Sequence, residues 1–271
     1  MEAEPVTPSR APAGVQPLGH DRGLVTLLFS DVVGSTALKQ ALGDRAGVAL
    51  LQQHHELFRQ VLRDFAGAEV IKTAGDSFLI LFPMPSEAVR CALLLQGRLR
   101  QFNQGLTVAV QDRLGLHMGE VVIEEIAPGQ RDVHGIQVDT CSRVMGLAQG
   151  GQILMTRGVF DSARQMLKGE DIAGVGALSW VSHGRYLLKG VEEPVEICEV
   201  AEAGRSPLRP PDTTEKAQRH SSPDEEPVLG WRPAVDQLVP NTQWVLEKKL
   251  GEGGFGEVWL GRHQKLKERR V

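Results

Sequence analysis

Two aspartates at the ends of apolar runs are the residues of this sequence best suited to chemistry. Asp31 follows the run 24–30, and Asp76 separates two runs that read as strands, 69–73 and 77–82. Carboxylates at neighbouring strand ends can hold a pair of Mg²⁺ ions, which bind a nucleotide triphosphate and activate an attacking hydroxyl. The sequence therefore predicts two-metal phosphoryl chemistry, a signature shared by polymerases, nucleases and many NTP-dependent enzymes.

The elements that must position these aspartates follow from the periodicity of the apolar residues. Strands are predicted at 24–30, 69–73, 77–82, 113–117, 120–125 and 152–156, with two more ending near Val200. Helices are predicted at 36–65, 86–102 and 135–148, with a polar loop before the last. The order βαββαβ, with additional C-terminal strands, predicts an α+β fold with a ferredoxin-like layer, although order alone leaves other α+β topologies open.

Composition narrows the class of protein. The chain has 271 residues and a net charge of −4, so the broad basic surface of a nucleic-acid binder is not expected. No apolar run approaches the roughly 20 residues that cross a bilayer, and the N-terminus lacks the apolar core of a signal peptide. Three widely spaced cysteines match no metal-ligand spacing and read as reduced core thiols. We therefore expect a cytoplasmic protein without a nucleic-acid or membrane partner.

Changes in composition predict four segments. Residues 1–22 are rich in Pro, Ala and Gly and predict a disordered leader. Residues 23–201 carry the periodic elements of one folded domain. Residues 202–240 are dense in Pro and charge and predict a linker, and 241–271 begin a second unit.

Four sequence blocks together resemble the catalytic domain of class III nucleotidyl cyclases. The blocks are TLLFSDVVGST, KTAGDSF, RLGLHMGEV and DVHGIQVDTCSR, and they occur in the order, and close to the spacing, of that family. The resemblance implies that Asp31, Asp76 and the backbone carbonyl of Val32 bind two Mg²⁺ or Mn²⁺ ions. It also implies that the turn formed by Gly34, Ser35 and Thr36 offers amide groups at a helix N-terminus to the triphosphate.

The same resemblance implies which residues recognise the nucleotide. Lys72 and Asp132 match the family pair that reads adenine, because an ammonium suits the acceptor N1 and a carboxylate suits the N6 amino group. Guanine presents the opposite polarity at both positions, so the pair indicates ATP, with GTP as a minor alternative. Arg113 and Lys189 match basic residues near the triphosphate.

The predicted helix 135–148 carries two further positions of the family pattern. Arg143 matches the arginine that stabilises the α-phosphate in the transition state, a role suited to a permanently charged guanidinium. Asp139 departs from the family, which usually has asparagine there to position the ribose. At a spacing of four residues the two could instead form an exposed ion pair worth only about 0.3–0.5 kcal/mol. Two hypotheses stay open: an active adenylate cyclase, and a degenerate domain that binds nucleotide and regulates an attached kinase.

The implied reaction is attack of the ribose 3′ hydroxyl on the α-phosphorus of ATP, which yields cyclic AMP and pyrophosphate. In this family the site forms between two catalytic domains, so one copy per chain implies a head-to-tail homodimer with two equivalent sites. His117 is expected to be a satisfied core residue. The adjacent His54 and His55 lack further ligands nearby in the sequence and are given no metal role.

The C-terminal string WVLEKKLGEGGFGEVWLGRH resembles the glycine-rich loop and flanking strands of a eukaryotic-type Ser/Thr protein kinase, with Gly251, Gly253, Gly256 and Val258 at the pattern positions. The sequence stops before the residues that phosphotransfer needs. We therefore expect a kinase fragment that is poorly ordered, or a longer gene product in which a kinase follows.

Overall fold

The structure is a computed structural model that describes residues 21–205, 208–220, 233–239, 242–253, 256–265 and 269–270. Most of the predicted leader and parts of the linker and of the glycine-rich loop lie outside these residues. The chain divides into two compact units, Met1–His220 and Ser221–Val271. Within the described residues, no helix is long and apolar enough to cross a membrane.

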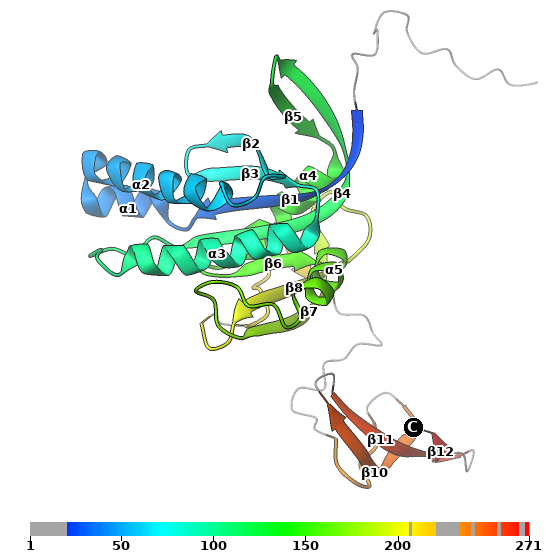
Figure 1. Cartoon of the computed structure of the whole chain (residues 1–271). Helices are drawn as coiled ribbons and strands as arrows, with labels where there is room; N and C mark the ends of the chain where they lie inside the picture. Colours follow the sequence, from blue (N-terminus) through cyan, green and yellow to red (C-terminus); the bar gives the residue numbers. More distant parts are fainter. Residues whose placement is uncertain are drawn as a thin grey trace, which may run out of the picture. The chain divides into compact units, whose positions relative to one another are not determined.

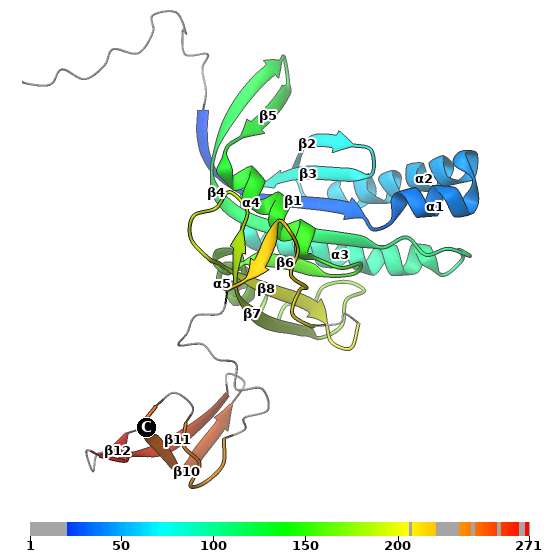
Figure 2. The same cartoon turned by 180° about the vertical axis from the view of Figure 1, so that it is seen from behind.

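The first unit is built on one mixed sheet. Its strands are β1 (Asp21–Val32), β2 (Glu69–Ala74), β3 (Ser77–Phe82), β4 (Asp112–Ala127), β5 (Gln130–His134), β6 (Ile153–Thr156), β7 (Leu178–Leu188), β8 (Val195–Glu202) and β9 (Ala217–Arg219). Among the described residues the strand order is β2-β3-β1-β4-β6-β8-β7-β9, and β5 pairs with β4. Figures 1 and 2 show that the β4–β5 hairpin projects beyond the rest of the sheet.

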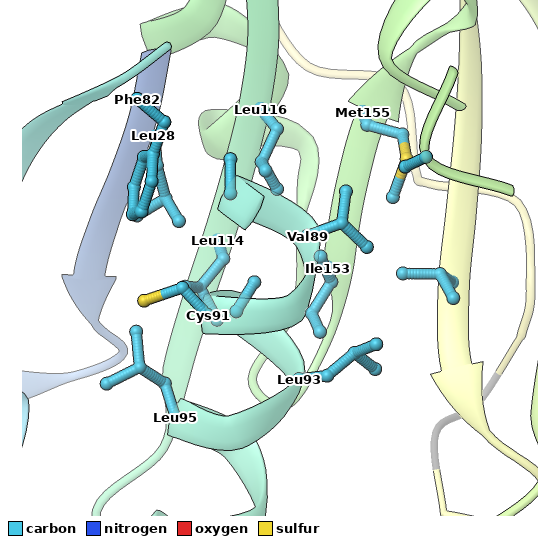
Figure 3. Packing of buried hydrophobic residues seen from close by; sticks show 14 of the residues in the cluster. Leu28, Phe82, Val89, Cys91, Leu93, Leu95, Leu114, Leu116, Ile153 and Met155 are labelled. Carbon is cyan, nitrogen blue, oxygen red and sulfur yellow. The ribbon is translucent and has the colours of Figure 1, made fainter. Parts of the chain in front are cut away.

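Helices cover both faces of this sheet. They are α1 (Ser35–Leu42), α2 (Asp44–Leu62), α3 (Pro85–Asn103), α4 (Ile136–Leu147) and α5 (Arg157–Leu167). Residues of α2, α3 and α5 share one apolar cluster with Leu28, Leu114 and Met155 of the strands, part of which is drawn in Figure 3. Helix α4 packs on the opposite face, where Cys141 joins Leu27 and neighbouring strand residues. The α+β fold is as predicted, and helices lie on both faces of the sheet.

Several predicted boundaries are wrong, each for a local reason. The predicted helix 36–65 is two helices, because Gly43 between them has φ 78° and ψ 154°, outside the helical region. The predicted strands 113–117 and 120–125 are one continuous strand, β4, and the predicted polar loop contains β5. Helix α5, which was not predicted, is amphipathic and buries an apolar stripe that includes Val159, Phe160 and Leu167.

Part of the predicted linker belongs to the first unit. Strand β9 pairs with β7, with Leu188 opposite Ala217, and Ala217 is buried in the cluster that contains Tyr186. The Tyr186 hydroxyl donates to the carbonyl of Pro211 at 3.0 Å. The linker prediction for 202–240 is therefore wrong over 208–220, because one small apolar residue and backbone bonding hold a segment rich in Pro and charge. The predicted leader likewise ends too late, since β1 begins at Asp21.

The second unit contains a small antiparallel sheet. Strands β10 (Trp244–Gly253), β11 (Gly256–His263) and β12 (Arg269–Arg270) lie in that order. Trp244 pairs with His263 at one end of the hairpin, and Lys249 donates to Glu257 at 2.6 Å across the strands. The expectation of a poorly ordered tail is wrong for these strands, because β10 and β11 satisfy each other's backbone groups.

Candidate active site

The strand ladders bring the two aspartates to the same end of the sheet, where β1 ends and β3 begins. We call this end, with Asp31 and Asp76, the aspartate edge. Asp31 is the penultimate residue of β1, which runs antiparallel to β3 with Ser30 opposite Phe78. Asp76 lies in the tight turn that joins β2 to β3, next to Gly75, whose φ of 63° favours glycine. The end of β1 thus meets the start of β3, and the segments that carry both carboxylates are neighbours.

The Asp31 carboxylate already has two partners. Ser77 donates its hydroxyl to one oxygen at 2.7 Å, and Arg113 donates to the other through Nε at 3.0 Å and a terminal nitrogen at 2.5 Å. Arg113 stands directly opposite Asp31 in the β1–β4 ladder. The Asp31 side chain is 17% exposed and that of Arg113 32% exposed, so the ion pair is partly shielded yet open to a ligand.

The donors at this edge suit a hard divalent cation. Asp31, Asp76 and the Val32 carbonyl offer oxygen atoms, which Mg²⁺ and Mn²⁺ prefer. Burial raises the pKa of the Asp112 carboxyl, its hydrogen bond to His54 lowers it, and the negative charges of Asp31 and Asp76 raise it by smaller amounts. Among the described residues, no group of three or more His, Cys, Asp or Glu side chains could hold a metal alone. Mg²⁺ is usually held by one or two carboxylates and takes its remaining ligands from water and substrate phosphates, which suits two aspartates and a carbonyl.

The turn after β1 ends in the first amides of α1. Gly34 caps α1 with φ 68° in the left-handed region, and its carbonyl accepts the Leu38 amide at 2.9 Å. Ser35 and Thr36 are the first helical residues, whose amides have no partner within the helix. The turn thus provides backbone donors beside the aspartate edge.

Helix α4 holds the other candidate catalytic residues. Asp139 is exposed in its first turn, whereas Arg143 is half-buried. In the described structure the two form no ion pair, and the Arg143 Nε is buried without a hydrogen-bond partner. The alternative of an exposed ion pair between them is therefore wrong, because the buried neighbours Cys141 and Val144 bring this part of the helix onto the sheet.

Comparison with known proteins identifies the family. Residues 20–193 match the profile of the adenylate and guanylate cyclase catalytic domain. The chain belongs to this family. It is 30% identical over 166 residues to an adenylate cyclase of Lachancea kluyveri, and the aligned region covers 54% of the chain and 9% of that protein. It is also 30% identical over 213 residues to the receptor-type adenylate cyclase GRESAG 4.3 of Trypanosoma brucei brucei, which covers 65% of the chain and 16% of that protein.

Solved cyclase structures share the fold. The guanylyl cyclase Cya2 superposes with a TM-score of 0.56 and 26% identity over 71% of this chain and 99% of that one. An adenylate cyclase of Trypanosoma brucei in its monomeric state gives a TM-score of 0.58 at 24% identity, over 68% of this chain and 90% of that one. The chain thus covers nearly whole cyclase domains but only a small share of the long curated relatives.

The predicted adenine residues of this cyclase domain lie on β2 and β5. Lys72 is exposed beside a register irregularity of β2. Asp132 is half-buried, and one of its oxygens accepts the Val133 amide at 2.8 Å. An ion pair between Arg131 and Glu69 joins the two strands. The other oxygen of Asp132 and the Lys72 ammonium remain candidate contacts for a base.

Lys189 lies after β7, and three strands, β4, β6 and β8, separate β7 from β1 in the sheet. It is exposed, and its backbone amide donates to the carbonyl of Lys216 at 2.8 Å. Within the described residues of one cyclase domain, the hydrogen-bond partners of the Asp31 side chain are Ser77 and Arg113. The structure therefore groups Asp31, Asp76 and Arg113 with Val32 and the turn at the start of α1. Of the other candidates, Lys72 lies on β2, Asp132 on β5, Asp139 and Arg143 on α4, and Lys189 after β7.

Sequence reasoning missed a buried ion pair beneath this edge. The Nε2 atom of His54 on α2 donates to the carboxylate of Asp112 on β4, at 2.8 and 3.0 Å from its two oxygens. The neighbouring histidines were visible in the sequence, but their partner lies 58 positions away and only the fold reveals it. His117 is bonded as expected of a core residue, to Thr156 at 2.9 Å and Gln137 at 2.6 Å.

Proposed function

We propose that this cyclase domain is an adenylate cyclase that converts ATP to cyclic AMP and pyrophosphate in signal transduction. The observation that carries the proposal is the convergence of Asp31 and Asp76 at one sheet edge, with Arg113 beside them. Adenylate cyclases among the similar proteins support the choice of ATP. The Lys72 and Asp132 side chains support it chemically, because their polarity complements adenine. The buried free cysteines support a reducing, cytoplasmic setting.

In this mechanism Asp31, Asp76 and the Val32 carbonyl hold two Mg²⁺ or Mn²⁺ ions. When bound, such ions lower the pKa of the 3′ hydroxyl and neutralise charge on the leaving pyrophosphate. Arg113 can transfer its donors from Asp31 to a phosphate oxygen, since a planar guanidinium suits either acceptor. The amides of Gly34, Ser35 and Thr36 bind the triphosphate.

Arg143 supplies the transition-state contact. Its buried Nε–H group has no hydrogen-bond partner, so it can donate to a phosphate oxygen that gains negative charge during the reaction. Lys189 binds the triphosphate. Because the site of this family forms between two catalytic domains, Lys72, Asp132 and Arg143 act from a second copy in a head-to-tail homodimer.

An assay of the full chain with Mn²⁺ tests this function. Cyclic AMP should form from ATP at a rate well above that of the matched Asp31→Ala variant, and GTP should give less cyclic product. Equal rates for the two proteins would refute the proposal. A Lys72→Glu variant that keeps the preference for ATP would show that the base contacts are assigned wrongly.

A second function is a degenerate domain that binds nucleotide and regulates a kinase, and Asp139 favours it. A carboxylate in place of the family asparagine lacks an amide donor and adds negative charge near phosphates. If this residue limits catalysis, Asp139→Asn should raise cyclic AMP production at least tenfold. If the variant gains nothing and wild type is active, the degenerate reading is wrong.

For the second unit we propose that β10 and β11 begin a Ser/Thr kinase domain. The hairpin that they form supports this, because the glycine pattern lies at its turn. Sequencing the gene beyond Val271 tests the proposal: a continuous reading frame should encode the catalytic loop of a kinase.

A further inference from the structure

His54 and Asp112 form a buried, hydrogen-bonded pair near the aspartate edge. The His54 side chain is 0% exposed and that of Asp112 3% exposed. Both carboxylate oxygens lie within 3.0 Å of His54 Nε2. A buried carboxylate is costly unless it is paired, so the strand start and the helix are held in one relative position.

The pair lies directly behind the residues that face the proposed metals. Asp112 and Arg113 are consecutive in β4, so their side chains point to opposite faces of the sheet. Arg113 reaches Asp31 on one face, while Asp112 reaches His54 of α2 on the other. In the ladder, Asp112 stands opposite Val32, whose carbonyl is a proposed metal ligand.

Backbone contacts anchor the same point. The Asp112 carbonyl accepts a bond from the Gln96 side chain at 3.0 Å and one from the Gly151 amide at 2.8 Å. The start of β4 is therefore held by α2, by α3 and by the loop before β6. A shift of α2 would move both Arg113 and the end of β1.

The neighbouring histidine lies beneath the other aspartate. The His55 ring packs edge-on against Phe78, with ring centroids 5.0 Å apart. Phe78 is the second residue of β3, so the His55 ring lies close to the β2–β3 turn. Two consecutive residues of α2 thus support the two segments that carry Asp31 and Asp76.

We propose that His54 and Asp112 are positioning residues of the cyclase: their buried pair sets the geometry of the metal-binding edge without touching substrate or metal. The proposal rests on the proposed function of Asp31 and Asp76 as metal ligands. Its physical basis is that a hydrogen bond between buried polar groups is directional, whereas apolar packing alone tolerates small shifts.

Binding of Mn²⁺ to the full chain, followed by electron paramagnetic resonance of the free ion, tests this role without catalysis. His54→Leu should weaken Mn²⁺ binding at least fivefold. His54→Gln should stay within twofold of wild type, because the glutamine amide can donate to the same carboxylate. The double variant His54→Leu with Asp112→Leu leaves no unpaired charge and should fold, yet bind Mn²⁺ at least threefold more weakly.

A second buried pair in the same domain is the matched control. His183 on β7 donates to Glu199 on β8 at 2.7 Å, and both side chains are at most 1% exposed. Strands β4 and β6 separate β8 from β1, which is about 14 Å at the usual strand spacing. His183→Leu should lower the thermal midpoint as His54→Leu does, but leave Mn²⁺ affinity within twofold of wild type.

The outcomes separate the positioning role from the proposed function. If Asp31→Ala binds Mn²⁺ as wild type does, the metal site itself is wrong and the positioning role falls with it. If Asp31→Ala loses binding but the double variant binds as wild type does, only the positioning role is overturned. Equal loss of Mn²⁺ affinity in His54→Leu and His183→Leu would also overturn it, because general destabilisation would then explain both.

Discussion

Substitution of Gly115 tests whether α4 must approach β4 closely for the cyclase to work. A Cβ added at Gly115 would lie 2.3 Å from the backbone nitrogen of Met145 and 2.5 Å from its Cα. Ordinary contact begins near 3.4 Å, so α4 would have to move by about 1.1 Å. The Cys141 thiol, which contacts the carbonyls of Leu27 and Gly115, would move with it.

This overpacking has a calculable cost. Insertion of a methyl group into a packed interior costs about 1–3 kcal/mol, which for a domain of this size lowers the thermal midpoint by roughly 2–12 °C. Arg143 is two residues from the point of contact, and a displacement of about 1 Å can cost on the order of 10²-fold in rate. We therefore expect Gly115→Ala to lose both stability and turnover, with turnover falling further than stability explains.

Circular dichroism melting and the cyclic AMP assay measure the two effects. Gly146→Ala is the matched control, because the same helix carries a glycine with no atom within 4 Å of its added Cβ. Alanine there should stabilise the helix by about 0.5–1 kcal/mol and leave turnover intact. Unchanged melting and turnover in Gly115→Ala would refute the close-approach argument.

Three further predictions follow from burial and bonding. Burial raises the pKa of the thiols of Cys91, Cys141 and Cys198. Iodoacetamide at about pH 8 should therefore label these cysteines negligibly in the native chain and fully in the urea-unfolded chain, as measured by mass spectrometry. Burial lowers the pKa of His117, so its contribution to stability is present above about pH 6.5 and is lost as the pH falls; His117→Gln should flatten the fall in thermal midpoint between about pH 7 and about pH 5. A chain truncated after residue 204 lacks β9, and its thermal midpoint should be roughly 4 °C or more below that of a chain truncated after His220. Equal midpoints would show that β9 contributes nothing to the stability of the domain.

Much of the fold was predictable because the apolar residues of its strands are strongly patterned. The β2–β3 hairpin was predicted almost to the residue, since two apolar runs flank a turn that contains Gly75. Helix α5 was missed because its sequence mixes charge with apolar residues, and only contact with the sheet shows which stripe is buried. Strand β9 was missed because three residues carry no periodicity of their own.

The site was predictable by residue type but not by pairing. Asp31 could be named because its position at the end of an apolar run is a local property. Its bond to Arg113 depends on the register of β1 against β4, which no local pattern fixes. The same holds for His54 and Asp112, where a helix and a strand meet only in the folded chain.

The docking of β9 also determines how the sheet can meet other molecules. An open strand edge invites pairing with another chain, and proteins suppress this with short edge strands, irregularities and charge. Here β9 covers the outer edge of β7 with a strand of only three residues, and β2 at the other end has a register irregularity and the exposed Lys72. Both ends of the sheet are thus poor templates for strand addition, so the proposed homodimer would have to form through other surfaces than the sheet edges.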